Sequence, residues 1–222
     1  MLDDFDDRRA FDWYAALDYG FNHYTVVLLA CRDNDGNIII VDEHSARGWV
    51  PERHAQAIKA MFQRHNVRIH PGYEPTPFRS INARAFSPDT VIPNEHLIIK
   101  QFSAGADLFA RQSTGITIAD QYNALGIPLR PARMERVNGW AVILKRLGDP
   151  AAGVKPTLFI HRRCARLIDC LPALQHDPNR PEDVLKVDPD DDGIGGDDAA
   201  DALRYLIATK LAEVHMRKIR GF

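Results

Sequence analysis

Carboxylates are the side chains of this sequence whose positions could support chemistry. Asp18 ends the apolar run FDWYAALDYG, and Asp107 follows a second apolar run in SAGADLF. Asp197 and Asp198 follow a Gly-Gly pair and open the amphipathic stretch DDAADALRY. A carboxylate that is partly withdrawn from water needs a cation or hydrogen-bond donors to offset its lost hydration. The sequence therefore offers three acidic points that a metal ion could join.

Each acidic point also has an ordinary structural interpretation. Asp18 could form a turn at the end of its strand, and Asp107 could cap a short helix. Asp197 and Asp198 would lie at a helix start, where the helix dipole favours negative charge. Asp201 lies four residues after Asp197 and three after Asp198, so the first turn of this helix has one anionic face. Local features leave the structural and the metal-binding interpretations open.

The acid-rich stretch 188–196 is a partial match to a calcium-binding loop. Aspartates stand at its first, third and fifth loop positions, and Gly193 stands at the sixth. Position twelve is Ala199, where such a loop needs a bidentate glutamate. We therefore interpret 188–196 as a solvated acidic approach to the helix that follows.

Several other catalytic motifs are missing from the sequence. It has no GxxxxGK[ST] phosphate loop, no GxSxG nucleophile elbow and no HExxH zinc helix. Its histidines form no close pair with ligand spacing, so a zinc site is not expected. Its three cysteines show no CxxC spacing, and neither a secretory segment nor an apolar run of about 18 residues occurs. These features predict a protein of a reducing cytoplasm with no membrane partner.

The elements that would position the acids follow an α/β order. Three apolar runs predict a strand meander, and a DNDG turn joins the last two. A helix is expected next, at 50–66, and strands then alternate with helices. The expected ranges are strands at 11–20, 23–32 and 37–44, a strand at 96–107, a helix at 115–126, a strand at 127–132, a helix at 134–147, a strand at 157–163, a helix at 164–174 and a closing helix at 197–218.

This order predicts an RNase H-like domain, a mixed β-sheet flanked by α-helices. We expect one such domain over 11–222. Residues 1–10 are acidic and aperiodic, so we interpret them as a disordered leader or the remnant of an interdomain linker. Residues 67–95 contain five prolines and no sustained period, which indicates a long irregular insertion.

The formal net charge of -2 means that any nucleic-acid binding must come from local basic groups. Such groups occur in the second half of the chain, on or beside the predicted helices and strands. The candidates for phosphate contact are Arg130, Arg133, Arg136, Lys145, Arg162 and Arg163.

Five blocks of the sequence, in order from about Trp13 to Ala208, resemble the nuclease domain of the phage terminase large subunit. They are AALDYG with its strand hairpin, GADLFARQSTGITIADQYNALGI, RMERVNGWAVILKRL, PTLFIHRRCARLIDCLPAL and GDDAADALRY. The resemblance implies a resolvase/integrase-type RNase H-like fold. It also implies a metal-dependent endonuclease that cuts concatemeric double-stranded viral DNA during genome packaging. The chain has no Walker A motif, so it resembles the nuclease half of such a subunit and not its ATPase half.

The resemblance also suggests roles for the acids. Asp18 matches the catalytic aspartate of the first strand, and Asp197 matches the acid that opens the final helix. Asp198 stands where many relatives have histidine. Relatives commonly have an Asp-Pro dipeptide near Gly105, so Asp107 would serve as the second acid from a position shifted by two. The alternative second acids are Asp42 and Glu43, which end the third strand.

The implied cofactors are two Mg²⁺ or Mn²⁺ ions, which prefer hard oxygen ligands. The implied partners are double-stranded DNA, the terminase ATPase domain, the portal and the small terminase subunit, in the cytoplasm of the bacterial host. Two alternatives stay open. One is another RNase H-like DNA nuclease of the resolvase or transposase type, and the other is a non-catalytic packaging or docking module.

Overall fold

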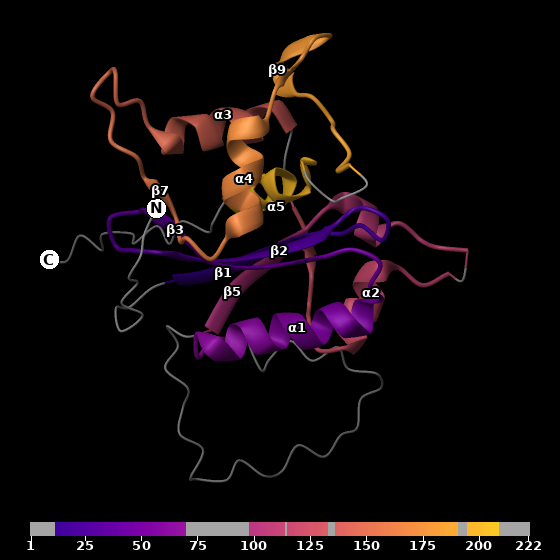
Figure 1. Ribbon diagram of the computed structural model, residues 1–222. Coiled ribbons are helices and arrows are strands. Elements are labelled where there is room, and N and C mark those ends of the chain that lie inside the picture. Colours follow the sequence, from indigo (N-terminus) through magenta and orange to yellow (C-terminus); the bar gives the residue numbers. More distant parts are fainter. Residues whose placement is uncertain (1–11, 70–97, 114, 133–135, 191–194, 209–222) are drawn as a thin grey trace, which may run out of the picture.

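The computed structural model describes residues 12–69, 98–113, 115–132, 136–190 and 195–208. The predicted leader at 1–10, most of the predicted insertion at 67–95 and the end of the predicted closing helix lie outside these ranges. A central sheet separates two helical layers, as Figure 1 shows. No helix in the described ranges combines the length and apolar character needed to cross a membrane.

The sheet has seven strands in the order β4-β5-β1-β2-β3-β7, with β6 paired to β5. The first three strands form the predicted antiparallel meander, while β5 is parallel to β1 and β7 is parallel to β3. Both faces of the sheet are covered, which is why its central strands are almost continuously apolar. The strands are β1 (Asp12–Asp18), β2 (Thr25–Arg32), β3 (Ile38–Ala46), β4 (Arg68–Ile69), β5 (Ile98–Ala104), β6 (Arg130–Pro131) and β7 (Leu158–Ile160).

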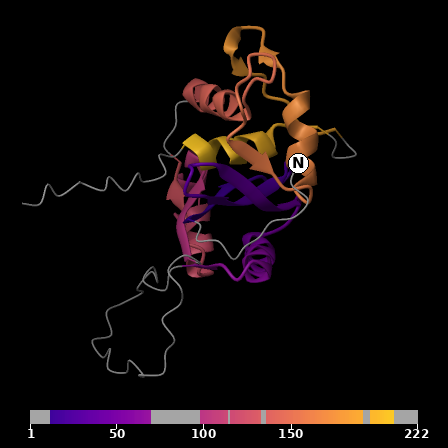
Figure 2. The same ribbon diagram turned by 90° about the vertical axis from the view of Figure 1, so that its left-hand side faces the viewer.

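Helices cover both faces of the sheet (Figure 2). The first layer contains α1 (Pro51–Arg64) and α2 (Ile118–Ala124), and the second contains α3 (Arg136–Leu147), α4 (Ala165–Ala173) and α5 (Asp198–Ala208). Strand residues alternate between the two cores. Ala15 and Leu17 pack with α1, whereas Ala16 packs with α5. Asp18 continues this alternation, so its side chain leaves β1 on the α5 face.

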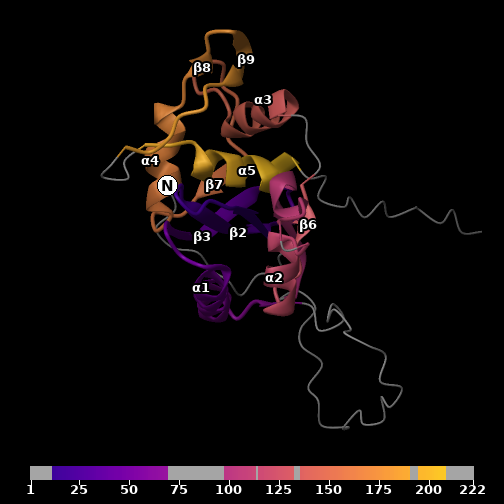
Figure 3. The same ribbon diagram turned by 90° about the vertical axis from the view of Figure 1, so that its right-hand side faces the viewer.

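Two parts of the described structure were not predicted from the sequence: β4, which lies at the start of the range 67–95 that was expected to be irregular, and a hairpin after α4. After α4 the chain forms a separate hairpin of β8 (His176–Asp177) and β9 (Arg180–Val184). The sequence RPEDV of β9 is polar and mostly exposed, so it has no apolar alternation that would indicate a strand. This hairpin rises beside α3, away from the sheet (Figure 3). The segment that follows it leads back to the start of α5.

The strand register brings two predicted acids to one edge of the sheet. In the parallel pair of β1 and β5, Leu17 is opposite Ala104. The next residues, Asp18 and Gly105, therefore lie side by side, with neighbouring strands about 4.8 Å apart. Asp107 follows within the 3₁₀ turn η2 (Ala106–Phe109). Helix α5 contacts β1, β2 and β5 and so brings its own acids to the same edge.

Candidate active site

Asp18 is the carboxyl group on which the charges of the other acids act. Burial raises the pKa of Asp18 well above its ordinary value. The negative charges of Asp201, Asp198 and Asp107 raise this pKa further, and Lys186 acts in the opposite direction. The carboxyl is therefore held among like charges at the end of a buried strand. Such a group is a candidate for cation binding, because a cation would relieve both the burial and the repulsion.

Asp201 is the carboxylate that acts most strongly on Asp18, and sequence analysis did not assign it a role. It is almost fully buried on α5, and its carboxylate pairs with Lys186, Arg136 and Arg204. Burial acts to raise the pKa of Asp201, but these three cations outweigh burial and lower it. The signal that could have identified Asp201 was its helical spacing from Asp198.

Asp197 and Asp198 are both buried at the start of α5. Asp197 pairs with Lys186 at 3.1 Å and with Arg136 at 3.6 Å, whereas Asp198 pairs with Arg166 at 3.6 Å. Burial raises the pKa of Asp198, although Arg166 opposes this effect. The Oδ2 atoms of both aspartates are buried. That of Asp197 faces Lys186 and Arg136 and that of Asp198 faces Arg166, so a bound cation would have to compete with these side chains.

The start of α5 is fixed by the preceding glycines and by α4. Gly195 and Gly196 have φ angles of 80° and 85°, which only glycine adopts without strain. Arg166 donates to the Gly195 carbonyl at 2.9 Å, and the Cys170 thiol donates to the Gly196 carbonyl at 3.2 Å. Helix α4 thereby sets the place at which the acidic turn of α5 begins.

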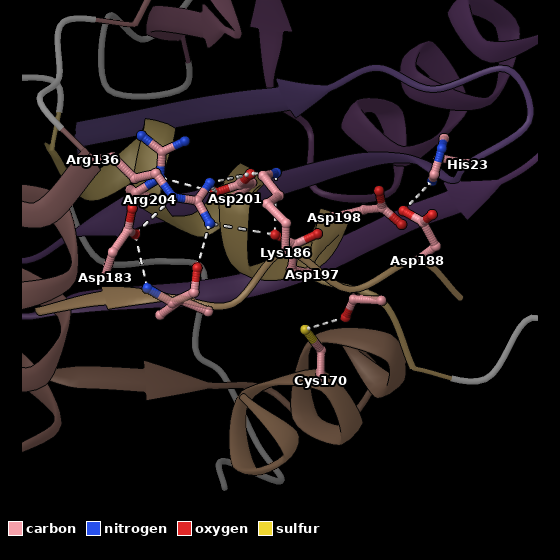
Figure 4. Close-up of polar contacts among 12 residues, drawn as sticks. His23, Arg136, Cys170, Asp183, Lys186, Asp188, Asp197, Asp198, Asp201 and Arg204 are labelled. Carbon is pink, nitrogen blue, oxygen red and sulfur yellow. Dashed lines mark hydrogen bonds and ion pairs between the residues drawn. The ribbon is translucent and has the colours of Figure 1, made fainter. Parts of the chain in front are cut away.

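Two cations of the protein reach into the acidic cluster, as Figure 4 shows. Lys186 follows β9, and its ammonium contacts the carboxylates of Asp197 and Asp201. Arg136 opens α3 and contacts Asp183 at 2.7 Å as well as Asp197 and Asp201. Sequence analysis predicted that Arg136 would contact DNA, which stays a prediction. In the structure its guanidinium pairs with carboxylates of the protein.

The other predicted basic residues lie on separate elements. Arg130 on β6 is exposed. It is opposite Ser103 in the pairing of β6 with β5, so it lies near the end of β5 that leads to Asp107. Lys145 is exposed on α3. Arg162 and Arg163 are exposed after β7. Arg133 lies outside the described residues.

The structure does not bring Asp42 or Glu43 to Asp18. Asp42 accepts hydrogen bonds from Arg64 at 2.9 Å and lies 2.9 Å from His65 Nε2. Glu43 accepts hydrogen bonds from the backbone N–H groups of the first turn of α4. The residue of β3 that is level with Asp18 is Ser45, so Asp42 lies two strands away and about 10 Å back along the sheet.

Tyr205 is a further residue at this edge that sequence analysis did not single out. It lies on α5 one turn after Asp201, and the Arg204 guanidinium carbon is 4.5 Å from its ring centroid. Burial raises the pKa of Tyr205 to about 12, and the charges of Asp18, Asp201 and Asp107 contribute to the rise while Arg204 opposes it. The phenol therefore stays protonated among the acids at neutral pH.

The chemistry of the donors fits a hard divalent cation. The cluster consists of carboxylates, the ligands that Mg²⁺ and Mn²⁺ prefer, and it includes the buried Oδ2 atoms of Asp197 and Asp198. Within the described ranges, no three acidic, histidine or cysteine side chains already enclose a space for an ion. Lys186 and Arg136 supply positive charge to the cluster in this conformation. Metal binding would therefore require the ion to compete with these two side chains.

No family model and no curated protein sequence matches this chain. Solved structures do match it. The P22 large terminase nuclease domain aligns with a TM-score of 0.60 at 15% identity, covering 92% of this chain and 84% of that one. The chain has the fold of a phage large-terminase nuclease domain. The predicted RNase H-like fold, a mixed sheet flanked by helices, is thus confirmed.

Two other terminase structures show the same likeness. The nuclease domain of g2p, the large terminase of bacteriophage SPP1, was solved with bound Mn and aligns with a TM-score of 0.51 at 13% identity, covering 90% of this chain and 87% of that one. The large terminase of the thermophilic bacteriophage D6E in complex with ADP aligns with a TM-score of 0.57 at 16% identity over 92% of this chain. This chain spans 41% of the length of the D6E protein.

Proposed function

We propose that this chain is a metal-dependent endonuclease that cuts concatemeric double-stranded viral DNA during genome packaging. One observation carries the proposal. The register of β1 against β5 and the packing of α5 on both strands bring the carboxylates of Asp107, Asp198 and Asp201 to the edge that carries Asp18, and burial and these charges together raise the pKa of Asp18. The terminase nuclease fold of the chain supports the same function.

Asp18, Asp107 and Asp201 are the residues that would hold Mg²⁺ or Mn²⁺, with Asp198 adding a fourth carboxylate. Asp197 stays a predicted ligand; like Asp201, it faces Lys186 and Arg136, with which an ion would have to compete. Two such ions, when bound, would activate water for attack on the phosphodiester and stabilise the leaving 3′ oxygen. The protonated Tyr205 adds a hydrogen-bond donor to this edge. The carboxylate cluster beside Asp18 would thus hold the ions at which a phosphate group of the DNA binds.

DNA would be held through its phosphates, because the basic candidates are dispersed and carry no base-reading motif. Arg130 is the candidate nearest to the acidic edge, through its register beside Ser103. Lys145, Arg162 and Arg163 would contribute on the α3 and β7 side. The proposed partners are double-stranded DNA, the terminase ATPase domain, the portal and the small terminase subunit, in the host cytoplasm.

Cleavage of supercoiled plasmid in Mn²⁺ or Mg²⁺ tests the proposal. Wild-type protein should nick the plasmid only when metal is present, and Asp18→Asn and Asp201→Asn should be inactive. Asp169→Asn is the matched control, because Asp169 is an exposed acid of α4. If wild type shows no metal-dependent nicking, or if Asp18→Asn nicks equally well, the nuclease proposal is wrong. A four-way junction cleaved in preference to duplex DNA would instead support the resolvase-type alternative.

A non-catalytic packaging or docking module is the second candidate. The observation in its favour is that Lys186 and Arg136 already pair with Asp197 and Asp201. If these cations neutralise the cluster permanently, Mn²⁺ will neither bind the protein nor raise its melting temperature. Calorimetric titration of the metal-free protein with Mn²⁺ therefore separates the two candidates without a cleavage assay.

A further inference from the structure

The loop between β1 and β2 carries an exposed aromatic side chain. Phe21 follows Asp18 by three residues in the sequence and is 51% exposed. The backbone of this loop is held at two points. The Thr25 hydroxyl donates to the Gly20 carbonyl at 2.7 Å, and the Gly48 N–H donates to the Phe21 carbonyl at 2.7 Å. The loop therefore has a fixed backbone from which the Phe21 ring meets solvent.

A second loop, residues 47–50 between β3 and α1, lies against the first through that Gly48 hydrogen bond. The Trp49 ring centroid is 5.6 Å from that of His44 and 5.5 Å from that of His54. His44 Nε2 is 2.9 Å from His54 Nδ1, and His54 is fully buried. Burial lowers the pKa of both histidines, so they are neutral at pH 7. Trp49 therefore packs on uncharged rings.

Arg53, in the first turn of α1, lies over the Trp49 ring, with its guanidinium carbon 3.7 Å from the ring centroid. A guanidinium stacked on an aromatic ring keeps its N–H groups at its rim, where they can donate to phosphate oxygens. Arg53 is exposed, and no carboxylate within the described ranges pairs with it. Its sequence neighbour Glu52 adds instead to the rise in the pKa of Tyr19 that burial causes. Trp49 therefore orients a cation that no described acid neutralises.

The other basic side chains of the two loops are held by the segment that precedes α5. Arg47 donates to the Asp190 carbonyl at 3.4 Å, and His23 Nδ1 is 3.6 Å from Asp188 Oδ1 (Figure 4). An anionic ligand would have to displace this segment to reach Arg47 or His23. Arg53 needs no such rearrangement.

The strand register places Trp49 and Arg53 on the α1 side of the edge that carries Asp18. Leu17, the residue before Asp18, is opposite Val27, which is opposite His44. Two strand spacings, or about 10 Å, therefore separate His44 from Leu17 across the sheet. About 10 Å corresponds to three base steps along duplex DNA. A duplex with one phosphate at Asp18 would thus carry further phosphates past the start of α1.

We propose that Phe21 and Arg53 form a contact surface for duplex DNA beside the acidic cluster. Arg53 binds a backbone phosphate, and Phe21 packs against sugars and base edges in a groove. Neither residue belongs to the acidic cluster or to the basic residues that sequence analysis selected. The inference rests on the proposed nuclease function, because it states how the substrate of that site is held.

The test is the salt dependence of DNA binding. Fluorescence anisotropy would follow a labelled duplex of about 20 base pairs binding to the metal-free protein, between about 50 and 200 mM salt. Arg53→Ala should weaken binding and reduce the slope of log affinity against log salt by about 0.9, because one phosphate contact is lost. Phe21→Ala should weaken binding by about 5- to 10-fold at an unchanged slope, because its contact is apolar.

Two matched variants control for these effects. Lys59→Ala also removes one exposed cation from α1, and Leu144→Ala also removes an apolar side chain, 70% exposed, from α3. Both should bind the duplex as wild type does. Arg53→Lys keeps the charge without the planar guanidinium, so it should restore the salt slope but only part of the affinity. All these variants should melt within about 2 °C of wild type, because the side chains they change are exposed.

Cleavage kinetics give a second readout. Phe21→Ala and Arg53→Ala should raise the plasmid concentration needed for half-maximal cleavage in Mn²⁺. The rate at saturating plasmid should change much less, because neither side chain contacts the reacting phosphate. A lower saturated rate at an unchanged plasmid requirement would show that these residues act on the metal site and would overturn the inference.

The outcomes separate this inference from the function on which it rests. If wild type cleaves and Asp18→Asn does not, but Phe21→Ala and Arg53→Ala bind duplex with wild-type affinity and slope, the inference fails and the nuclease function stands. If wild type neither binds nor cleaves duplex DNA, the proposed function fails and the inference fails with it. If wild type binds duplex without cleaving it, the binding measurements alone decide the inference.

Discussion

Asp18 and Asp42 lie on parallel strands of one sheet, but their surroundings act on them in opposite directions. The pKa of Asp18 is raised by burial and by three neighbouring carboxylates. Burial also acts to raise the pKa of Asp42, but hydrogen bonds from His65, Arg64 and the Glu43 backbone outweigh it and lower the pKa. One acid is surrounded by like charges, and the other is fully compensated.

The difference teaches how a functional acid is distinguished from a structural one. Both residues end apolar sequence runs, and both were candidates for the metal site. Asp42 is satisfied by donors that the fold supplies, so it contributes to the stability of β3 and α1. No described residue supplies Asp18 with comparable donors, and holding it among acids costs stability unless a cation binds. A buried carboxylate whose lost hydration and charge repulsion are not offset by donors of the fold is therefore the candidate for a functional role.

The largest expected effect separates the two acids by activity. Asp18→Asn should reduce metal-dependent plasmid cleavage by at least about 100-fold without lowering the stability of the metal-free protein. Asp42→Asn should keep its cleavage rate but lose about 2 kcal/mol of unfolding free energy, because buried His65 loses its charged partner. Cleavage assays and urea unfolding measure the two effects. A similar loss of activity in both variants would contradict the assignment of Asp18 as a functional acid and Asp42 as a structural one.

The next effect is the response of stability to metal. Mn²⁺ at about 100 times its dissociation constant should add about 2.7 kcal/mol to the unfolding free energy of wild type. For a domain of this size, that corresponds to a rise of about 5–10 °C in melting temperature. Asp42→Asn should show the same rise, and Asp18→Asn should show little or none. A full rise in Asp18→Asn would place the ion elsewhere.

The pH dependence of stability should have opposite signs at the two acids. Folded Asp18 binds its proton more tightly than the unfolded chain, so its contribution to stability falls as pH rises above about 4 toward its raised pKa. The pKa of Asp42 is lowered, so its contribution is present above about pH 4 and is lost as pH falls through the folded value. Metal-free urea unfolding between about pH 3 and pH 8 measures both.

In that series, Asp18→Asn should gain stability relative to wild type as pH rises, and Asp42→Asn should lose it. Slopes of the same sign for the two variants would contradict the assignment of opposite pKa shifts.

The smallest expected effect concerns the cation that lies at the acidic cluster. Lys186→Ala removes an ammonium that competes with metal for Asp197 and Asp201, so the Mn²⁺ concentration for half-maximal cleavage should fall by about two- to fivefold. Lys59→Ala, an exposed change on α1 in the other helical layer, is the control. A higher Mn²⁺ requirement in Lys186→Ala would mean that Lys186 assists metal binding instead of competing with it.

Sequence patterns predicted most of the fold but only part of the site. The meander and helices α1 to α4 occur where expected, because apolar period and turn residues act over short distances. The hairpin of β8 and β9 was missed because its polar, exposed strands carry no such period. That omission mattered, since the hairpin leads into Lys186. The inward position of Arg136 was missed for a related reason, because its partners lie 47 to 65 residues away.

The sequence by itself determined most of the strands and helices and which acids stand at their ends, because these features depend on neighbouring residues. Only the tertiary structure decided which acids meet. The register of β5 against β1 puts position 105 beside Asp18, and the packing of α5 on β1 brings Asp201 there. Both depend on contacts between residues distant in sequence, and a shift of one residue in register would turn these side chains to the other face.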